Sequence, residues 1–306
     1  MNGSSLPAVQ QDRFDVCVIG SANLDVVAQC ERHPMPGETV LGSSLAEHAG
    51  GKGLNQAVAS ARSGARTTMI GAVGDDEPGH RLLAVLRDDG IAASHVVVAD
   101  NVTGRAIIVV DENGENMIVV IPGANAAVRL PATFPPCRVV VAQLEVPIAT
   151  VIAGFTAARA AGAMTVLNPA PAADLPAELL ELADVIVPNE HELVRLGGAE
   201  RLIALGVRAL VVTRGKQGVD LITPDGRHHI AAFPVEVVDT TGAGDAFCGS
   251  MCARLAAGDD LATAVRWGAA AGALATTVAG AVPAQPTTTA IQALLALDER
   301  TPVTNR

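Results

Sequence analysis

Aromatic residues are scarce in this chain, which has five Phe, one Trp and no Tyr among 306 residues. The core must therefore be built mainly from Ala, Val, Leu and Ile. A nucleobase in a substrate pocket is usually held by stacking on an aromatic ring, so the positions of the few aromatic residues bear on the choice of substrate.

Positive charge is also scarce. The chain has 21 Lys and Arg against 32 Asp and Glu, a net charge of −11 and a pI of about 5.0. A general nucleic-acid binder needs a basic face, so we expect no nucleic-acid partner. Small anionic ligands are not excluded, because backbone amides and one or two basic side chains can hold them locally.

Long apolar runs are missing, although 49% of the residues are hydrophobic, only 17% are charged and the mean hydropathy is +0.35. No run reaches the roughly 18 residues that a membrane span needs, and the richest stretch, 269–281, is short and dominated by Ala and Gly. The amino terminus has neither a basic segment nor an apolar segment typical of a secretory signal. We expect a large buried core, no membrane partner and a cytoplasmic location.

The chain has an odd number of cysteines, five, with no CxxC pair and no spacing between cysteine and histidine that is typical of a zinc site. They are Cys17, Cys30, Cys137, Cys248 and Cys252. We expect them to be buried, reduced thiols.

Short apolar runs alternate with helical patterns along most of the chain. Strands are expected at 14–20, 67–71, 138–142, 163–167, 184–187 and 209–213. Helices are expected at 52–62, around 80–86 with an end near Gly90, and at 243–257, 261–278 and 288–297. This alternation predicts an α/β fold with a mostly parallel, doubly wound sheet covered on both faces, forming one domain over residues 1–306.

Two stretches, at about 25–48 and 95–123, interrupt this alternation. The second contains Asn113-Gly114 between two β-rich runs, which is a strong hairpin signal. We expect both stretches to form antiparallel strands of one small sheet that projects as a lid. The alternative is two unrelated surface hairpins.

Two glycine-rich segments each lead into a predicted helix. AGGKGLNQ at 49–56 lacks the spacing of a Walker A loop and of a GxGxxG fingerprint, so it indicates either close backbone approach to a ligand or a tight strand-to-helix turn. VDTTGAGDAF at 238–247 combines an amide-rich loop with Asp245 in the first helical turn. The loop can hold a transferring phosphoryl group and the carboxylate can accept a proton, although an acid there is also typical of helix capping.

Two polar segments directly follow predicted strands, where α/β sheets bind ligands. PNEHE at 188–192 offers oxygen ligands suited to Mg²⁺, but it also fits a capped helix start. GSANLD at 20–25 offers Asn23 and Asp25 for vicinal hydroxyls, or forms a simple turn.

The order of these segments resembles the ribokinase-like (pfkB) family of carbohydrate kinases. The matching segments are GSANLD, PGETVLG, GGKGLNQA, GDD, NGEN, PGANAA, QLE, LNPAP, PNEHE and VDTTGAGDAF, over about residues 14–286. The resemblance implies a three-layer, Rossmann-like fold and ATP-dependent phosphorylation of the O5 hydroxyl of D-ribose, giving ribose 5-phosphate and ADP.

The resemblance also implies roles for individual residues. Asp245 would be the general base, and Gly242, Ala243 and Gly244 would form the anion hole. The sugar-binding positions would be Asn23, Asp25, Gly51, Lys52, Gly53, Asn55 and Glu145, together with Asp245. The ATP positions would be Asn189, Thr213, Arg214, Gly215, Lys216, Gln217, Gly218 and Gly244.

Two cations belong to the same resemblance. Asn189 and Glu192 match the motif tied to Mg²⁺ placement. Asp239 and Thr241 match K⁺ ligands, with carbonyl groups contributed by Ala275, Val278 and Gly280. Ala284 stands where the family typically has a serine, so we expect weaker activation by K⁺ than is usual in the family.

Other kinases of this class remain alternatives. A nucleoside kinase is disfavoured because both lid stretches lack aromatic residues, and a phosphosugar kinase has only Arg105 as a candidate for the distal phosphate. Deoxyribose, fructose or another small sugar, and a catalytically silent sugar sensor, are further alternatives. Consecutive apolar residues at 105–110 and 117–121 give the lid two apolar faces, which predicts a homodimer through the lids.

Overall fold

The computed structural model describes residues 13–300, and the remainder of the expected domain at 1–12 and 301–306 lies outside the described residues. A large sheet has the strand order β13-β12-β11-β10-β9-β8-β1-β4-β5. Its parallel strands are β1 (Phe14–Ile19), β4 (Thr67–Gly74), β5 (Ala92–Ala99), β8 (Cys137–Ala142), β9 (Met164–Leu167), β10 (Val185–Ile186) and β11 (Ala209–Thr213). The antiparallel strands β12 (Val219–Thr223) and β13 (Gly226–Ile230) complete one edge.

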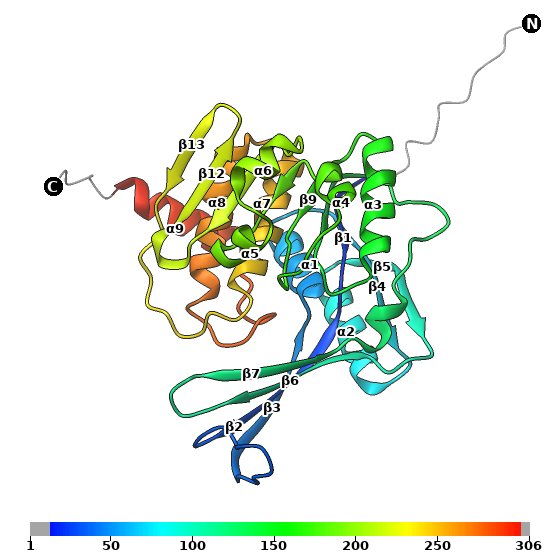
Figure 1. Ribbon diagram of the computed structural model, residues 1–306, viewed down its shortest axis with the longest axis vertical. Coiled ribbons are helices and arrows are strands. Elements are labelled where there is room, and N and C mark those ends of the chain that lie inside the picture. Colours follow the sequence, from blue (N-terminus) through cyan, green and yellow to red (C-terminus); the bar gives the residue numbers. More distant parts are fainter. Residues whose placement is uncertain (1–12, 301–306) are drawn as a thin grey trace, which may run out of the picture.

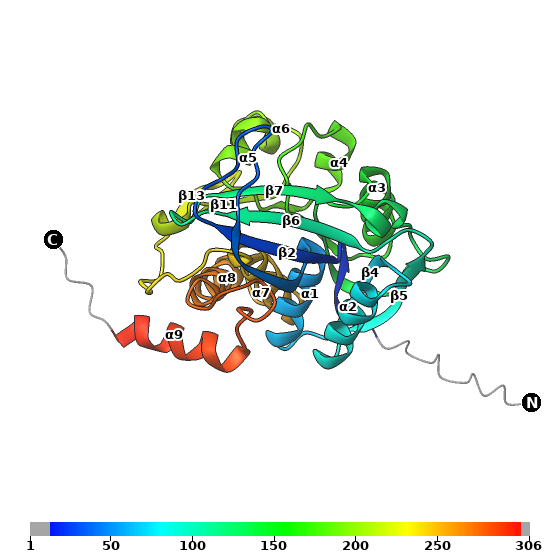
Figure 2. The ribbon, with the colours of Figure 1, turned by 90° about the horizontal axis from the view of Figure 1, so that it is seen from below.

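Helices cover both faces of this sheet (Figures 1 and 2). They are α1 (Lys52–Arg62), α2 (Glu77–Asp88), α3 (Ile148–Ala160), α4 (Ala177–Leu182), α5 (Glu190–Arg195), α6 (Ala199–Ala204), α7 (Ala243–Ala257), α8 (Leu261–Ala275) and α9 (Thr288–Arg300). Two short 3₁₀ helices are η1 (Gly123–Ala127) and η2 (Gly215–Gln217). The predicted α/β fold with a mostly parallel, doubly wound sheet is confirmed.

The core is divided between the two faces by the alternation of side chains along each strand. On β1, Val16 and Val18 pack with residues of α1, α2, α7 and α8, whereas Cys17 and Ile19 pack with α3, α4 and α6. The central strands β1, β4 and β8 are buried on both faces, and their sequences are therefore nearly continuous apolar runs. All five cysteines are buried and free, as the sequence predicted.

A second sheet of four strands projects from the body as the lid (Figure 1). Its strands, in the order β3-β2-β6-β7, are β2 (Asn23–Cys30), β3 (Gly42–Gly50), β6 (Gly104–Val110) and β7 (Asn116–Ile121). The two interrupting stretches thus meet in one sheet and are not unrelated hairpins. The hairpin at Asn113-Gly114 joins β6 to β7 antiparallel, and Asp111 accepts the backbone N–H groups of Asn113 and Glu115 within its turn.

The lid differs from the expectation in two respects. Its outer pairs are antiparallel, but the central strands β2 and β6 run parallel, from Asn23 opposite Gly104 onwards. The reason is topological, because β2 and β6 follow β1 and β5, which run parallel in the large sheet, and both leave it at the same end. In addition, residues 95–99 belong to β5 of the large sheet, so the second lid segment begins at Gly104.

Helix α8 ends at Ala275, three residues before the expected end at 278. The Thr276 and Thr277 hydroxyls donate to the carbonyls of Ala273 and Leu274, and the Thr276 carbonyl accepts the N–H groups of residues 238 and 239. These hydrogen bonds replace the next helical turn, so the helix ends at Ala275. Within residues 13–300, no helix has the length and apolar character to cross a membrane.

Candidate active site

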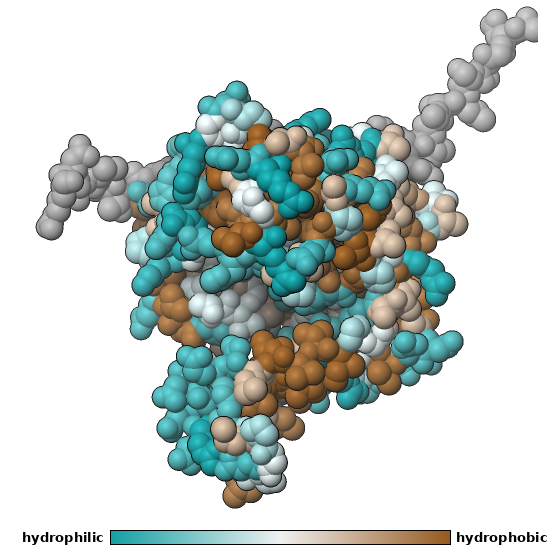
Figure 3. Space-filling model, viewed as in Figure 1, coloured by the Kyte–Doolittle hydropathy of each residue, from teal (hydrophilic) through white to brown (hydrophobic). Residues whose placement is uncertain are grey.

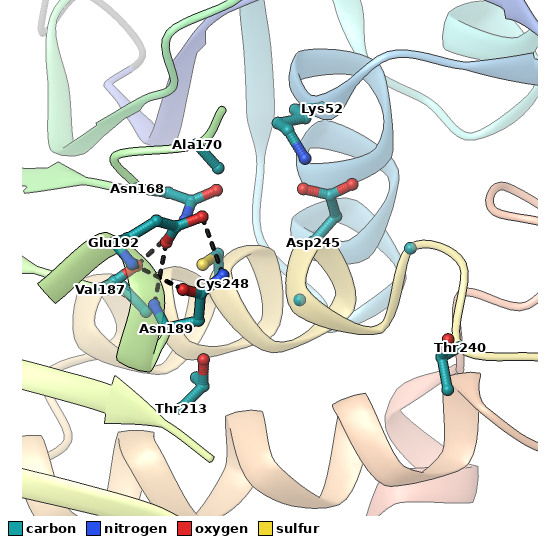
Figure 4. A pocket seen from close by; sticks show the side chains of 12 residues that line it. Lys52, Asn168, Ala170, Val187, Asn189, Glu192, Thr213, Thr240, Asp245 and Cys248 are labelled. Atoms are coloured by element: carbon teal, nitrogen blue, oxygen red, sulfur yellow. Dashed lines mark hydrogen bonds between the residues drawn. The ribbon is translucent and has the colours of Figure 1, made fainter. Parts of the chain in front are cut away.

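A cavity of about 230 Å³ lies beyond the carboxyl ends of β9, β10 and β11, next to the amino ends of α1 and α7 (Figure 4). It is lined by Lys52, Asn168, Ala170, Val187, Asn189, Glu192, Thr213, Thr240, Gly242, Gly244, Asp245 and Cys248. Three segments that are remote in the sequence, GGKG, PNEHE and GAGD, therefore share one cavity. This is the edge at which open α/β sheets bind ligands.

The amino end of α7 forms one wall of the cavity. Its N-cap residue is Gly242 with φ 73°, a left-handed conformation that favours glycine. No heavy atom lies within 4 Å of the position that a Cβ on Gly244 would take, so this residue borders open space. Backbone N–H groups at such a helix start have no partner within the helix and are available to an anion.

Asp245 lies in the first turn of α7 and is 6% exposed. Each of its carboxylate oxygens accepts one side-chain amide from α1. Asn55 Nδ2 donates to Oδ2 at 2.9 Å, and Gln56 Nε2 donates to Oδ1 at 2.9 Å. The carboxylate is therefore held in one orientation by two neutral donors.

Lys52 points toward Asp245 across the cavity (Figure 4). The negative charges of Asp245, Glu145 and Glu192 raise the pKa of Lys52 despite the opposing effect of its burial. The ammonium group is thus charged at neutral pH, between the predicted sugar side and the predicted nucleotide side of the site.

Glu145 links the turn after β1 to the start of α1. Its Oε2 accepts Ser21 Oγ at 2.5 Å and the backbone N–H of Lys52 at 3.2 Å. Gly51 precedes α1 as its N-cap residue, and the backbone of Gly53 packs against that of Gly20 and Ser21. The glycine-rich segment is therefore a tight strand-to-helix turn as well as part of the cavity wall.

The two predicted sugar-binding residues on β2, Asn23 and Asp25, lie in different surroundings. Asn23 is 2% exposed and its Oδ1 accepts Asn125 Nδ2 at 2.7 Å. Burial, together with the charges of Glu145 and Asp245, raises the pKa of Asp25 to about 7, against a partial lowering by Lys52. A hydroxyl-bearing ligand beside Asp25 would replace part of the lost hydration with hydrogen bonds.

Asn189 and Glu192 form a capping box at the start of α5. Glu192 N donates to Asn189 Oδ1 at 2.8 Å, and Asn189 N donates to Glu192 Oε2 at 2.9 Å. The capped-helix interpretation of PNEHE is therefore correct, and both side chains also line the cavity. Burial raises the pKa of Glu192.

The turn 213–218 is only partly in contact with the cavity. Thr213 lines it, whereas Lys216 and Gln217 in η2 are exposed, with Gly215 before them and Gly218 after. Arg214 forms ion pairs with Glu190 at 2.9 Å and with Asp220 at 3.3 Å. The turn is thereby fixed beside Asn189.

The predicted K⁺ residues come together beside the anion-hole loop. Asp239 Oδ1 accepts Thr241 N at 2.9 Å, and Asp239 Oδ2 accepts Gly280 N at 2.8 Å, which joins loop 238–241 to loop 275–284. Burial opposes ionisation of Asp239, but these hydrogen bonds outweigh it and lower its pKa. Ala284 is buried in the same region, packed near Ala275.

Several polar residues of the site, four of them buried and Asn168 half-buried, were not singled out by the sequence. They are Ser21, Gln56, Asn125, Gln143 and Asn168. Each lies within a segment used for the family resemblance, but only the three-dimensional contacts show what its side chain does.

Comparisons with known proteins agree with this geometry. The family model for pfkB family carbohydrate kinases matches residues 13–288, so the chain belongs to the pfkB family of carbohydrate kinases. The predicted family is confirmed.

Among individual relatives and solved structures, the chain is similar to several proteins named ribokinase. The chain is 38% identical to the ribokinase of Staphylococcus aureus, over 89% of this chain and 96% of that protein. It is 39% identical to the bifunctional ribokinase/ribose-5-phosphate isomerase A of Fructilactobacillus sanfranciscensis, over 94% of this chain but only 57% of that protein. The Arabidopsis thaliana ribokinase complexed with ribose and ATP is similar in structure, with a TM-score of 0.84 and 30% identity over 92% of this chain and 99% of that one.

Proposed function

We propose that this carbohydrate kinase is a ribokinase, which transfers the γ-phosphoryl group of ATP to O5 of D-ribose and releases D-ribose 5-phosphate and ADP. The observation that carries the proposal is the position of Asp245. It is held by Asn55 and Gln56 beside the amino end of α7, with hydroxyl-binding groups on one side and Asn189 and Glu192 on the other. The curated relatives named ribokinase support ribose as the sugar.

In the proposed reaction, Asp245 accepts the proton of the O5 hydroxyl as that oxygen bonds to the γ-phosphorus. The bond between this phosphorus and the bridging oxygen of ADP breaks, and ADP leaves with the electron pair. The backbone amides of 242–244 and the Lys52 ammonium stabilise the negative charge of the transferring group. Positioning and charge stabilisation of this kind supply most of the catalysis in phosphoryl transfer.

The sugar would lie between β2 and the start of α1. Asn23, Asp25, Asn55 and Glu145 offer acceptors and amide donors for its hydroxyl groups. The lid strand β2 carries two of these groups, so closure of the lid over the sugar would complete the pocket. Excluding water in this way protects ATP from hydrolysis.

The donor groups suit the two cations that the family implies. Both oxygens of Glu192 face Asn189 in the capping box and the side chain is buried, so Asn189 and Glu192 would hold a hydrated Mg²⁺ through water. Mg²⁺ would neutralise phosphate charge. For K⁺, no hydrogen bond is found among the described residues to the carbonyls of Thr241, Val278 or Gly280, so these oxygens are available beside the Asp239 carboxylate.

The lid would also join two copies of the chain. Every residue of β7 is exposed, including Met117 at 58% and Val119 at 64%. Figure 3 shows hydrophobic residues gathered where the lid meets the body. A second copy of the same sheet would cover this apolar edge.

A substrate panel tests the proposed function. Purified protein with ATP, Mg²⁺ and K⁺ would be assayed for ADP formation with ribose, deoxyribose, fructose, adenosine and fructose 6-phosphate. The highest kcat/KM is expected for ribose. A higher value for adenosine or for fructose 6-phosphate would overturn the assignment.

A further inference from the structure

A row of buried amides leads from β8 to the carboxylate of Asp245. Gln143, which follows β8, and Gln56 on α1 both have side chains with no exposed surface. Gln143 Nε2 donates to Gln56 Oε1 at 2.6 Å, and Gln56 Nε2 donates in turn to Asp245 Oδ1 at 2.9 Å. Gln143 lines no part of the cavity and does not contact the carboxylate itself.

The chemistry of these groups allows only one orientation of the Gln56 amide. The second N–H of its NH₂ group donates to Asn168 Oδ1 at 3.1 Å. A flipped Gln56 would place its oxygen against the acceptor oxygens of both Asp245 and Asn168, and its NH₂ group against the NH₂ group of Gln143. The donor on Gln143 is thus a third contact, and the only one of the three on the Gln56 oxygen, that favours the orientation in which Gln56 presents its NH₂ group to Asp245.

The amide of Gln143 itself is only half satisfied. Its Oε1 is buried and has no hydrogen-bond partner among the described residues. Leaving such an acceptor unpaired destabilises the folded protein. The neighbouring Gly20 also has to lack a side chain, since a Cβ there would lie 2.1 Å from Gln143 Oε1.

We propose that Gln143 is a positioning residue for the phosphoryl transfer, acting through Gln56 to hold the Asp245 carboxylate toward the reacting hydroxyl. This inference rests on the proposed function, because it assumes that Asp245 is the base. Gln143 supplies the donor to Gln56 Oε1, so the NH₂ group of Gln56 stays directed at Asp245.

Gln143→Met tests the proposal, since it keeps the approximate volume and removes the donor. We expect kcat to fall by about ten- to a hundredfold, because small errors in placing a catalytic group have effects of this size. The KM values for sugar and ATP should change by less than about twofold, since Gln143 touches neither ligand in the proposed mode. Gln143→Asn keeps an amide but places it one methylene further from Gln56, so its kcat should fall to a similar extent. This variant replaces Gln143→Met in the test if Gln143→Met folds poorly.

Ser63→Ala is a matched control. It removes another buried hydrogen bond between α1 and α7, from Ser63 Oγ to Ser250 Oγ at 2.8 Å, away from the cavity. This variant should keep the wild-type kcat, even where its melting temperature falls as much as that of Gln143→Met.

A double-mutant cycle separates positioning from a purely structural role. If Gln143 acts only through Gln56, the variant Gln56→Met with Gln143→Met should have nearly the same kcat as Gln56→Met alone. Additive losses, or a folded Gln143→Met with the wild-type kcat, would overturn the inference. The cycle is measured with whichever sugar of the panel the wild type phosphorylates. If that sugar is not ribose, the assigned substrate is wrong, but the cycle still tests the role of Gln143. A wild type that forms no ADP in response to any sugar of the panel would overturn both the proposed function and the inference about Gln143.

Discussion

Asn55 Nδ2 donates to Oδ2 of Asp245 at 2.9 Å, although 190 residues separate the two in the chain. This bond fixes the start of α1, which follows the lid strand β3, to the start of α7, where the anion-hole loop ends. In the proposed binding mode, a sugar held by the lid and a phosphoryl group held at the start of α7 would meet at the same carboxylate.

Asp25 should make sugar binding depend on pH. Its pKa of about 7 lies above the ordinary value of 3.8, mainly because of burial. As the pH falls through about 7, Asp25 gains a proton and loses acceptor capacity for the sugar hydroxyls. We therefore expect kcat/KM for ribose to fall below pH 7 in steady-state assays, and Asp25→Asn to have a low value without this dependence.

The same residue should affect stability in the opposite direction. Because the folded protein binds this proton more tightly than the unfolded chain, ionisation of Asp25 destabilises the unliganded fold as the pH rises from about 4 to 7. Asp25→Asn should therefore melt at a higher temperature than the wild type at pH 8. The exposed Asp225→Asn is the control, and equal melting temperatures for Asp25→Asn and wild type at that pH would count against the raised pKa.

Ala284→Ser should strengthen activation by K⁺. The added hydroxyl restores the group that is typical of the family, and one additional polar interaction corresponds to about a two- to tenfold change in affinity. Titration of the rate with KCl at constant ionic strength should show half-activation at a lower concentration than in the wild type. Ala279→Ser, in the exposed part of the same loop, should leave the titration unchanged. A wild-type rate that is independent of K⁺ would refute the cation site.

Charges on the lid should separate the proposed dimer. Met117 and Val119 lie two positions apart on β7, on the same face of the strand. Light scattering at micromolar concentration should give twice the 31.1 kDa chain mass for the wild type and one chain mass for Met117→Lys with Val119→Lys. Val194→Lys, at an exposed position on α5, should remain dimeric. A wild-type mass near 31.1 kDa would contradict the dimer.

The sequence predicted most of the large sheet because its central parallel strands β1, β4 and β8 are buried on both faces. It missed β5, whose residues are only partly buried, and assigned residues 95–99 to the lid. That GGKG, PNEHE and GAGD belong to one site followed from the family resemblance, since each segment taken alone also fitted a simple turn or a capped helix start. The sequence did not predict the parallel pairing of β2 with β6, because pairing between distant strands depends on the direction in which each leaves the large sheet. The sequence also did not predict the roles of Gln56 and Gln143, because it does not show which groups a buried glutamine contacts.

The central claim is that Asp245 is the base of a ribose-phosphorylating reaction. Asp245→Asn keeps the shape of the side chain, so the fold should survive, which circular dichroism can verify. The contrasting variant Glu192→Gln should mainly change the Mg²⁺ concentration needed for activity, because Glu192 lines the cavity at the proposed Mg²⁺ position beside Asn189.

The most direct test is the rate of ADP formation with saturating ribose and ATP, compared between the wild type and Asp245→Asn. Removing a general base typically lowers the rate by about 10²–10⁴-fold, and we expect kcat to fall within that range while KM for ATP stays nearly unchanged. A folded Asp245→Asn that keeps more than about a tenth of the wild-type kcat would contradict this role. Asp245 would then be a helix-capping acid, and the proton would have to go to another group.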